Sequence, residues 1–420
     1  MTTFHIQTFG CKSNQYESQG IREALVAAGF VPAAGVEDAD VCIINTCSVT
    51  GRAGASCRNA IRKNLRANPR ARLVVTGCGV DLGDTFPDLP GRPPLLVPNA
   101  KKHAMPALLA LPSPGPDDVA AVGENRFALA ISCFHDHTRA FIKVQDGCDN
   151  FCSYCAVPFA RGKPESRPLA DIRDEALRLV DHGHAELVLT GINIGAYSHG
   201  GHALADVVSA LAGTPGLARL RLGSVEPPQV TRDLVAAMAS SGTVCPHVHL
   251  PLQSGDDAVL AAMGRRYTTA EFMDKVALLK DGLVNPAITT DIIVGFPGET
   301  ARAAAGAGEL SREAGLSRLH VFLFSPRPGT RAAAMRQTVT DREIEERKNA
   351  LLGTGRELAE KYAASCIGLR ERIIVERNGS GLSDRYVRVR PDAPAAEGGV
   401  LAVRITGSDG AELSGTICAD

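Results

Sequence analysis

The stretch GCDNFCSYC, residues 147–155, decides how the rest of the chain is interpreted. It places Cys148, Cys152 and Cys155 in a C-x3-C-x2-C arrangement directly after the strand-like run AFIKVQ (140–145). Three thiolates on one short loop can hold three irons of a cubane cluster, which leaves the fourth iron without a protein ligand. An open metal position is what a catalytic site requires, and the amino-acid part of S-adenosylmethionine could bind there. A zinc loop is the alternative, although zinc sites usually supply four ligands in pairs.

Strand-like and helical runs alternate along the chain on both sides of this loop. On its C-terminal side, six strand-like runs separated by helical stretches predict a parallel barrel, complete or partial. These runs are residues 140–145, 186–191, 218–223, 247–252, 287–295 and 318–324. On its N-terminal side, three runs alternate with helical stretches and predict a doubly wound parallel sheet. These runs are residues 4–10, 39–47 and 72–78, with helices expected at 15–29 and 50–67.

The end of the chain has a different character. A long polar helix at 341–364 precedes short β-rich runs between 370 and 418, which predict a small barrel of antiparallel strands. We therefore expect an α/β protein with an N-terminal doubly wound parallel-sheet domain, a central partial TIM-type (β/α)6 barrel and a small C-terminal β-barrel. The expected domains cover residues 1–116, 130–365 and 366–420, with LPSPGP (111–116) as a linker.

Composition narrows the classes of protein to consider. The N-terminus lacks a basic start followed by an apolar run, and no stretch approaches the roughly 18 apolar residues of a membrane span. We therefore expect a cytoplasmic protein without a membrane partner. Cytosolic thiols stay reduced, so the 12 cysteines favour metal binding or thiol chemistry over disulfides. Because the net charge is only -1, any surface that binds nucleic acid must be a local one.

Three further cysteines follow the three N-terminal strand-like runs. Cys11 follows the first run, Cys47 ends the second and Cys78 follows the third. The carboxyl ends of the strands in an open parallel sheet share one edge, so these three residues would meet there. Buried free cysteines are the alternative, because free cysteine is a common core residue. The other six cysteines match no motif, and Cys42 alternates within a buried strand as a core residue would.

On the predicted barrel, functional residues should follow the carboxyl ends of the strands. The residues in these positions are Gly191 and Asn193 after the second strand, Ser224 and Glu226 after the third, Gln253 after the fourth and Gly295 after the fifth. We predict that they contact S-adenosylmethionine or the substrate; ordinary loop residues are the alternative. Tyr154, inside the cysteine loop, is expected to pack near the adenine. His247 and His249 share one face of a strand and are expected to be structural.

Distinctive stretches of sequence continue through nearly the whole chain. They are TFGCKSNQYES (8–18), INTCSVT (44–50), TGINIGAY (190–197), HLPLQSGDDAVLAAMGR (249–265) and DIIVGFPGET (291–300). Together with GCDNFCSYC and the following AVPFARGKPESR (156–167), they resemble the radical S-adenosylmethionine methylthiotransferase family. The chain departs from that family at TGCGVD (76–81), where relatives usually have a Tyr and an Ala after the cysteine, and in its short, Arg-rich tail.

The resemblance implies two cofactor clusters and a reaction. One [4Fe–4S] cluster would be held by Cys148, Cys152 and Cys155, and an auxiliary [4Fe–4S] cluster by Cys11, Cys47 and Cys78. The first would reduce S-adenosylmethionine to a 5′-deoxyadenosyl radical, and the auxiliary cluster would present a methylated sulfur to the substrate carbon. FGCKSNQYES and TGINIGAY most resemble the branch that acts at adenine C2 of N6-threonylcarbamoyladenosine next to the anticodon, position 37 of tRNA.

Two alternatives to this reaction remain open. The first is a sister methylthiotransferase acting on isopentenyladenosine-37 of tRNA or on a ribosomal-protein aspartate. The second belongs to another class, a non-catalytic iron–sulfur module that binds RNA. Mass spectrometry after incubation with each substrate separates the enzymes, and the second alternative would form no 5′-deoxyadenosine.

The resemblance also implies partners. These are the anticodon stem-loop of tRNA and a reductant protein such as a flavodoxin or ferredoxin, with the protein itself a monomer and residues 366–420 a TRAM-like RNA-binding barrel. Two locally basic segments are consistent with an RNA partner. No acid lies between Asp40 and Asp81, where segment 52–72 carries seven cations. Residues 370–390 carry six Arg against three acids. A solvated helix face is the alternative for the first segment. Tyr386 is the only aromatic in the tail, which would limit base stacking.

Overall fold

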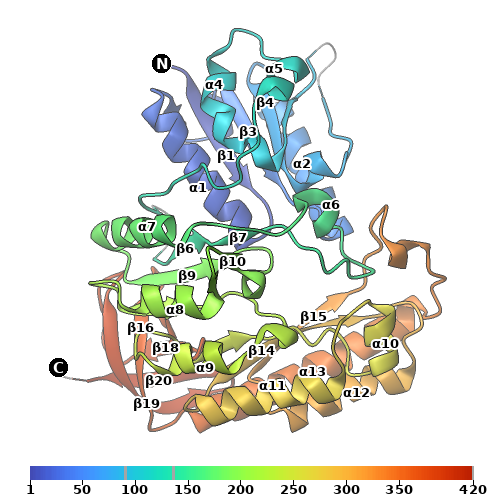
Figure 1. The fold of residues 1–420 in the computed structure, drawn as a ribbon, viewed down its shortest axis with the longest axis vertical. Coiled ribbons are helices and arrows are strands. Elements are labelled where there is room, and N and C mark those ends of the chain that lie inside the picture. Colours follow the sequence, from blue (N-terminus) through green and yellow to red (C-terminus); the bar gives the residue numbers. More distant parts are fainter. Residues whose placement is uncertain (89–91, 135–137, 419–420) are drawn as a thin grey trace. The chain divides into compact units, whose positions relative to one another are not determined.

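The computed structural model describes residues 1–88, 92–134 and 138–418 (Figure 1). Positions 89–91, 135–137 and 419–420, which fall within the three predicted domains, lie outside the described residues. Contacts divide the chain into two compact units. Unit 1 comprises Met1–Ser132, Asp146–Arg167 and Ser325–Ala333, and unit 2 comprises Cys133–Gln145, Pro168–Phe324 and Ala334–Asp420. The cysteine loop at 147–155 therefore belongs to the same compact unit as the N-terminal sheet.

Unit 1 is built on a parallel sheet of five strands in the order β2-β1-β3-β4-β5. This confirms the predicted parallel sheet and its strands β1, β3 and β4, whereas β2 and β5 were not predicted. Its strands are β1 (Thr3–Thr8), β2 (Val31–Pro32), β3 (Val41–Thr46), β4 (Arg72–Gly77) and β5 (Leu95–Val97). Its helices are α1 (Lys12–Ala27), α2 (Gly51–Ala67), α3 (Cys78–Asp81), α4 (Met105–Ala110), α5 (Pro116–Ala121) and α6 (Val157–Arg161). Every residue of β3 is buried, which explains its continuous apolar sequence.

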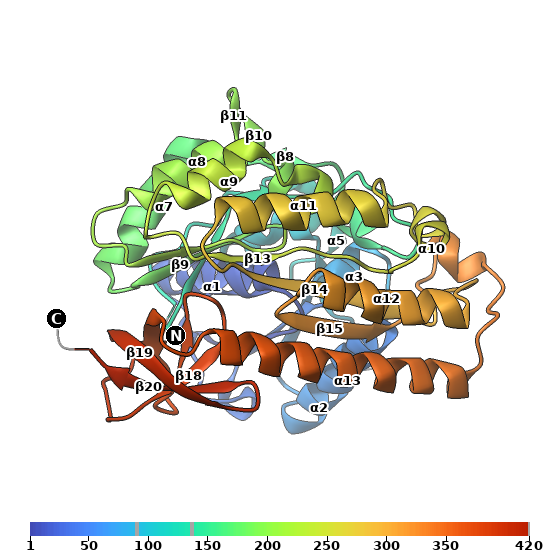
Figure 2. The same ribbon diagram turned by 90° about the horizontal axis from the view of Figure 1, so that it is seen from below.

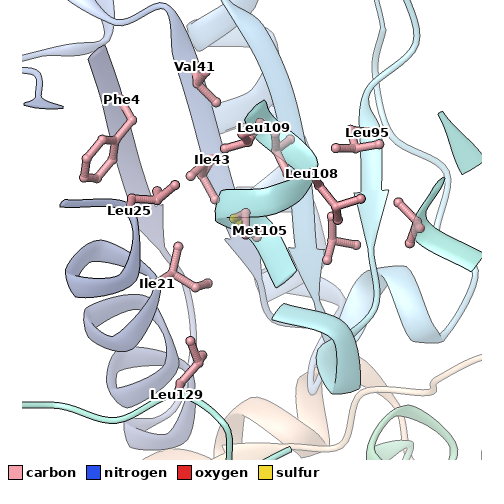
Figure 3. Packing of buried hydrophobic residues seen from close by; sticks show 13 residues of the cluster. Phe4, Ile21, Leu25, Val41, Ile43, Leu95, Met105, Leu108, Leu109 and Leu129 are labelled. Carbon is pink, nitrogen blue, oxygen red and sulfur yellow. The ribbon is translucent and has the colours of Figure 1, made fainter. Parts of the chain in front are cut away.

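Apolar side chains cover both faces of this sheet. On one face Phe4 and Ile43 pack with Ile21 and Leu25 of α1 and with Leu108 of α4 (Figure 3). The other face carries a second cluster made of Ala39, Cys42, Ile44, Ile61, Ala71, Leu73 and Val75. Successive residues of β3 alternate between the two clusters because side chains alternate across a strand. Cys42, 2% exposed, is therefore a core residue, as predicted.

Unit 2 contains two three-stranded parallel sheets, in the orders β12-β9-β6 and β13-β14-β15. Isolated bridges, Leu220 to Val244 and Ser224 to His249, connect the two sheets, so the strands form the expected partial barrel. The strands are β6 (Ala140–Lys143), β9 (Glu186–Thr190), β12 (Arg219–Arg221), β13 (His247–His249), β14 (Ala287–Val294) and β15 (Arg318–Leu323). The helices are α7 (Leu169–Asp181), α8 (Leu204–Ala212), α9 (Arg232–Ala239), α10 (Asp257–Ala262), α11 (Thr269–Gly282) and α12 (Ala301–Glu313). The short strands β10 (Ser198–His199) and β11 (His202–Ala203) also belong to unit 2, whereas β8 (Glu165–Ser166) belongs to unit 1 and β7 (Gln145–Asp146) has one residue in each unit.

The expected long helix and small barrel end the chain. Helix α13 (Asp341–Ser365) packs against β15 and leads into the closed barrel β16-β17-β18-β20-β19 (Figure 2). The barrel strands are β16 (Arg370–Val375), β17 (Gly381–Ser383), β18 (Arg388–Pro391), β19 (Val400–Asp409) and β20 (Glu412–Ile417). The strands are not all antiparallel, because β18 and β20 pair in parallel to close the barrel. None of the described helices is both long enough and apolar enough to cross a membrane.

Buried charges join this small barrel to β9 and β12. Arg219 and Arg221 both bind Glu186, and the nitrogen–oxygen distance from Arg221 to Glu186 is 2.8 Å. Arg219 also donates to the carbonyl of Leu382, and Arg221 donates to the carbonyl of Asp384 at 2.9 Å. One carboxylate thus orients two guanidinium groups, and their remaining N–H groups donate hydrogen bonds to backbone carbonyls of the C-terminal barrel.

We predict that Glu186→Gln lowers the free energy of unfolding by about 3–5 kcal/mol, because it leaves two buried guanidinium groups without their counter-charge. Burial alone would raise the pKa of Glu186, but Arg221 and Arg219 lower it from 4.5 to about 2. The stabilisation is therefore complete above pH 4.5 and lost as the pH falls from about 4.5 towards 2. Urea unfolding of the full chain at several pH values measures both effects.

The matched control for this prediction is Glu309→Gln, on the exposed face of α12. This substitution should leave the free energy of unfolding unchanged within about 0.5 kcal/mol. Equal midpoints for the two variants at neutral pH would contradict the role given to Glu186.

Candidate functional site

Each of three adjacent strands of unit 1 is followed by a cysteine. Cys11 precedes the first turn of α1 shortly after β1, Cys47 directly follows β3, and Cys78 directly follows β4 as the first residue of α3. Strands β1, β3 and β4 are parallel neighbours, and Thr46 pairs with Gly77, so Cys47 and Cys78 leave the sheet from paired positions. The predicted meeting of the three cysteines at one edge of the sheet agrees with this topology.

Two glycines allow the backbone to bring these cysteines together. Gly10 has φ +100°, and a Cβ atom there would lie 2.7 Å from the Sγ of Cys47. Gly77 has φ +95°, and a Cβ atom there would lie 2.4 Å from the carbonyl oxygen of Thr46. Both positions need a left-handed conformation and have no room for a side chain, so glycine is required at each.

The three thiols lie within electrostatic reach of one another. The pKa of Cys47 is raised to about 12, chiefly by burial and to a smaller extent by the neighbouring Cys78 and Cys11 thiols, while a hydrogen bond from the Val49 backbone acts in the opposite direction. Burial also raises the pKa of Cys78, which Arg161 opposes. Thiols crowded in this way are suited to iron, which binds thiolates and compensates their negative charge. The donor set therefore fits an iron–sulfur cluster.

Cys57 of α2 lies beside this set, although its sequence context gave it no role. Its Sγ accepts from the backbone nitrogen of Cys47 at 3.5 Å and donates to the Cys47 carbonyl at 3.6 Å. It thereby orients the peptide of Cys47. Its position on the buried face of an otherwise basic helix was the only signal in the sequence.

The cysteine loop at 147–155 begins at another glycine. Gly147 has φ +75°, and a Cβ atom there would lie 2.0 Å from the Lys163 carbonyl oxygen. The Cys148 nitrogen donates to the Gly162 carbonyl at 3.0 Å, and the Cys155 nitrogen donates to the Cys152 carbonyl at 3.0 Å. These contacts fold the loop back on itself and leave its three cysteines half-buried rather than in a core.

The geometry of both sets differs from that of a single-ion site. Among the described residues, no three His, Cys, Asp or Glu side chains are grouped so that they could hold one metal ion. A cubane does not need such convergence, because each thiolate binds a different iron. Three cysteines in each set match the ligand number of a cluster with one open iron.

The other predicted site residues occupy the expected strand ends in unit 2. Gly191 and Asn193 follow β9, Ser224 and Glu226 follow β12, Gln253 follows β13 and Gly295 follows β14. The Asn193 backbone nitrogen donates to Gln145 Oε1 at 2.7 Å, while the Asn193 Oδ1 is buried without a hydrogen-bond partner among the described residues. Gln253 has φ +66°, a conformation that non-glycine residues rarely adopt. These two residues combine an unpaired acceptor and a strained backbone, features typical of binding sites.

Other predicted strand-end residues form ion pairs or hydrogen bonds with neighbouring residues of the protein. Glu226 is paired with Arg265, and the Gly295 nitrogen donates to Glu299 Oε2 at 2.9 Å. A Cβ atom on Gly191 would lie 2.7 Å from the Gln145 carbonyl oxygen, so packing against protein backbone is enough to require this glycine. Tyr154 is half-buried in the cysteine loop of unit 1. Contacts of these residues with a cofactor stay predictions.

Sequence reasoning missed a buried polar network beside Cys78. Arg161 of α6 donates from Nε to Cys78 Sγ at 3.5 Å, and it is paired with Glu17 and Asp146. Lys102 is also paired with Glu17. The one signal in the sequence was Glu17 on a helix whose buried face is mostly polar, a pattern that apolar periodicity does not detect.

Comparisons with known proteins agree with the motifs. Residues 142–306 match the family described as "Radical SAM superfamily", and residues 3–85 match "Uncharacterized protein family UPF0004". Proteins named threonylcarbamoyladenosine tRNA methylthiotransferase MtaB are 36% identical in Chlamydia pneumoniae and 37% identical in Thermotoga maritima. The alignments cover 89% and 92% of this chain, and 87% and 91% of those proteins. A protein from Sphingopyxis alaskensis named tRNA-2-methylthio-N(6)-dimethylallyladenosine synthase is 32% identical, over 96% of this chain and 95% of that protein.

A solved structure resembles the fold. It is the radical S-adenosylmethionine methyltransferase TsrM from Kitasatospora setae, with a TM-score of 0.56 over 85% of this chain and 89% of that one. At 14% sequence identity, this likeness concerns the fold alone.

We predict that Gly77→Ala weakens the N-terminal cysteine set more than Gly83→Ala does. Both glycines have a left-handed φ, which costs about 1–3 kcal/mol for a non-glycine residue, but a Cβ atom on Gly83 would meet no atom of the described residues within 4 Å. Gly77→Ala must also displace the Thr46 backbone. Iron content after reconstitution and the thermal unfolding midpoint should fall for Gly77→Ala well below the values for Gly83→Ala; equal values would refute the packing argument.

Proposed function

Because the chain belongs to the tRNA methylthiotransferase family of radical S-adenosylmethionine proteins, we propose that it adds a methylthio group to C2 of N6-threonylcarbamoyladenosine at position 37 of tRNA. The family implies a [4Fe–4S] cluster and S-adenosylmethionine as cofactors. The relatives named for threonylcarbamoyladenosine are 36% and 37% identical, against 32% for the one named for dimethylallyladenosine. This difference favours threonylcarbamoyladenosine as the substrate.

One observation carries the two-cluster form of this proposal. Cys11, Cys47 and Cys78 leave adjacent parallel strands at one edge, in the same compact unit as the cysteine loop. A radical enzyme with one cluster needs only the loop, whereas insertion of sulfur needs a second sulfur-bearing centre nearby. We therefore assign an auxiliary [4Fe–4S] cluster to Cys11, Cys47 and Cys78, and the catalytic cluster to Cys148, Cys152 and Cys155.

The cofactors supply the difficult chemistry: a cluster and S-adenosylmethionine together generate a carbon radical that can abstract hydrogen from an unreactive C–H bond. The protein binds and orients the reactants and excludes water. Each cysteine set supplies three thiolates, so each leaves a position for a ligand that is not protein. In unit 2, the unpaired Asn193 Oδ1 can accept a hydrogen bond from an incoming ligand, and Gln253 has a strained backbone conformation after the end of strand β13.

We assign these and the other strand-end residues, Gly191, Ser224, Glu226 and Gly295, to binding of S-adenosylmethionine or the modified base, with Tyr154 near the adenine. The pairing of Glu226 with Arg265 fixes its carboxylate, which suits an orienting role rather than proton transfer. We also propose that residues 1–116, 130–365 and 366–420 form an N-terminal methylthiotransferase domain, a radical S-adenosylmethionine domain and a TRAM-like barrel.

RNA contacts are proposed for two basic regions. The first is α2, whose exposed side chains include Arg62, Lys63 and Arg66. The second is the C-terminal barrel, which we propose to be a TRAM-like domain; its Arg377 and Arg390 side chains are 85% and 78% exposed. Such cations supply the part of RNA affinity that depends on phosphate rather than sequence.

The ring of Tyr386 packs against other residues of the protein instead of being available to stack on an RNA base. Its ring is stacked on His247 with centroids 4.6 Å apart, and Arg221 lies over the ring at 5.2 Å. The only aromatic residue of the tail therefore supports packing, and RNA binding by this barrel would rest on charge. We further propose a cytoplasmic monomer that receives electrons from a flavodoxin or ferredoxin.

The proposed substrate leads to a direct prediction. Reconstituted protein, S-adenosylmethionine, a sulfide source and a chemical reductant should add a methylthio group to tRNA carrying N6-threonylcarbamoyladenosine-37, and not to tRNA carrying isopentenyladenosine-37 or to the ribosomal protein. Mass spectrometry of the digested tRNA measures the product. Methylthiolation of isopentenyladenosine alone would assign the sister activity, and the absence of 5′-deoxyadenosine would exclude radical chemistry.

A second experiment should distinguish the roles of the two cysteine sets. Replacing Cys11, Cys47 and Cys78 by Ala should remove about half of the iron, because one of two cubanes is lost, and leave 5′-deoxyadenosine formation intact. Replacing Cys148, Cys152 and Cys155 by Ala should remove the same amount of iron and abolish 5′-deoxyadenosine. Neither variant should form the methylthio product. The control Cys42→Ala, in the core of unit 1, should keep all of the iron, and unchanged iron in the first variant would disprove the auxiliary cluster.

A further inference from the structure

The side chain of Arg161 reaches from the cysteine-loop segment to the sheet edge of unit 1. Arg161 is the last residue of α6, which follows the loop at 147–155, and its side chain is 1% exposed. Its Nε donates to Cys78 Sγ over 3.5 Å. A charged donor from one cysteine-bearing segment thus contacts a cysteine of the other set.

The remaining guanidinium nitrogens of Arg161 are held by three side chains. Nη1 contacts a carboxylate oxygen of Asp146 at 3.2 Å, and Nη2 donates to Asn14 Oδ1 at 2.6 Å. Both nitrogens also contact the carboxylate of Glu17, and the distance from Nη2 to Glu17 Oε2 is 3.2 Å. Since the guanidinium is planar and its donors are fixed in direction, these contacts determine where Nε points.

The network around Arg161 is almost fully charged and almost fully buried. Lys102 is paired with Glu17 and donates to Asn45 Oδ1 at 3.1 Å. The side chains of Arg161, Lys102, Glu17 and Asp146 are at most 4% exposed. Buried ion pairs of this kind seldom stabilise a protein more than apolar side chains of the same volume would. Their place beside Cys78 suggests a use other than stability.

We propose that Arg161 is a positioning residue that donates a charged hydrogen bond to the Cys78 thiolate and thereby raises the reduction potential of the auxiliary cluster. The inference rests on the proposed function, because it presupposes a cluster on Cys11, Cys47 and Cys78. Hydrogen bonds to cluster sulfurs and positive charge nearby favour the reduced, more negative state of a cluster. Glu17 and Asp146 hold the guanidinium in place, and Lys102 offsets part of their negative charge.

Asn99 makes a second, weaker contact to the same sulfur. Its Nδ2 lies 3.9 Å from Cys78 Sγ and 2.8 Å from Asp81 Oδ2. Asn99 is neutral, so it provides a comparison for Arg161: a contact to the same atom without a full charge. Loss of Arg161 should therefore change the potential more than loss of Asn99.

The test uses the full chain with Cys148, Cys152 and Cys155 replaced by Ala, so that any cluster bound after reconstitution belongs to the auxiliary set. Redox titration followed by electron paramagnetic resonance gives its midpoint potential. Arg161→Met should lower this midpoint, and Asn99→Ala should lower it by less. Arg66→Met, which removes an exposed cation of α2, should leave it unchanged.

The outcomes separate the inference from the proposed function. If the background protein binds no cluster, the auxiliary site itself is wrong, and the role of Arg161 falls with it. If the cluster is present and Arg161→Met leaves its midpoint unchanged, only the role of Arg161 is wrong. Should Arg161→Met fail to fold, Arg161→Lys decides: its ammonium keeps the charge but cannot reproduce the planar fork, so a midpoint below that of the background protein supports the inference and an unchanged midpoint overturns it.

Discussion

The order of strands β1, β3 and β4 is the constraint on which the rest depends. Parallel pairing places the carboxyl ends of neighbouring strands at one edge, so three cysteines separated by dozens of residues become neighbours without any local motif. Gly10 and Gly77 make the approach possible, because a side chain at either position would collide with Cys47 or with the Thr46 backbone. The cysteine loop needs no such assembly, since its three thiolates lie on nine consecutive residues.

Buried charge is used in two ways in this chain. In unit 2, Glu186 orients Arg219 and Arg221 toward carbonyl groups of the C-terminal barrel, a structural use in which each donor ends on protein oxygen. In unit 1, Arg161 is held by Glu17 and Asp146, but its Nε ends on a cysteine sulfur. Buried arginine–carboxylate pairs thus hold the C-terminal barrel in unit 2, whereas in unit 1 they direct an arginine toward the sulfur of Cys78.

The strands and the cysteine loop could be predicted from the sequence because local patterns encode them, whereas Cys11, Cys47 and Cys78 share no local motif and were grouped from the expected strand order and the family resemblance. The buried run at β3 and the spacing of Cys148, Cys152 and Cys155 needed no tertiary information. The helical stretch expected between the runs 247–252 and 287–295 is divided into α10 and α11 by an interruption at 263–268, which depends on Gly264 at φ +72° and on the Thr268 cap. The start of α1 at Lys12 was missed because its N-cap, Cys11, makes no capping hydrogen bond. Arg161, Glu17 and Lys102 meet only through the fold, since 144 and 85 positions separate the two pairs.

The measurement that tests the central claim most directly is an anaerobic crystal structure of the reconstituted protein. Our account requires electron density for a cubane at each cysteine set, and one iron of each cubane without a cysteine ligand. Cys57 would then remain a hydrogen-bond partner of the Cys47 peptide. Density for no cluster at Cys11, Cys47 and Cys78, or a bond from Cys57 to the fourth iron, would contradict it.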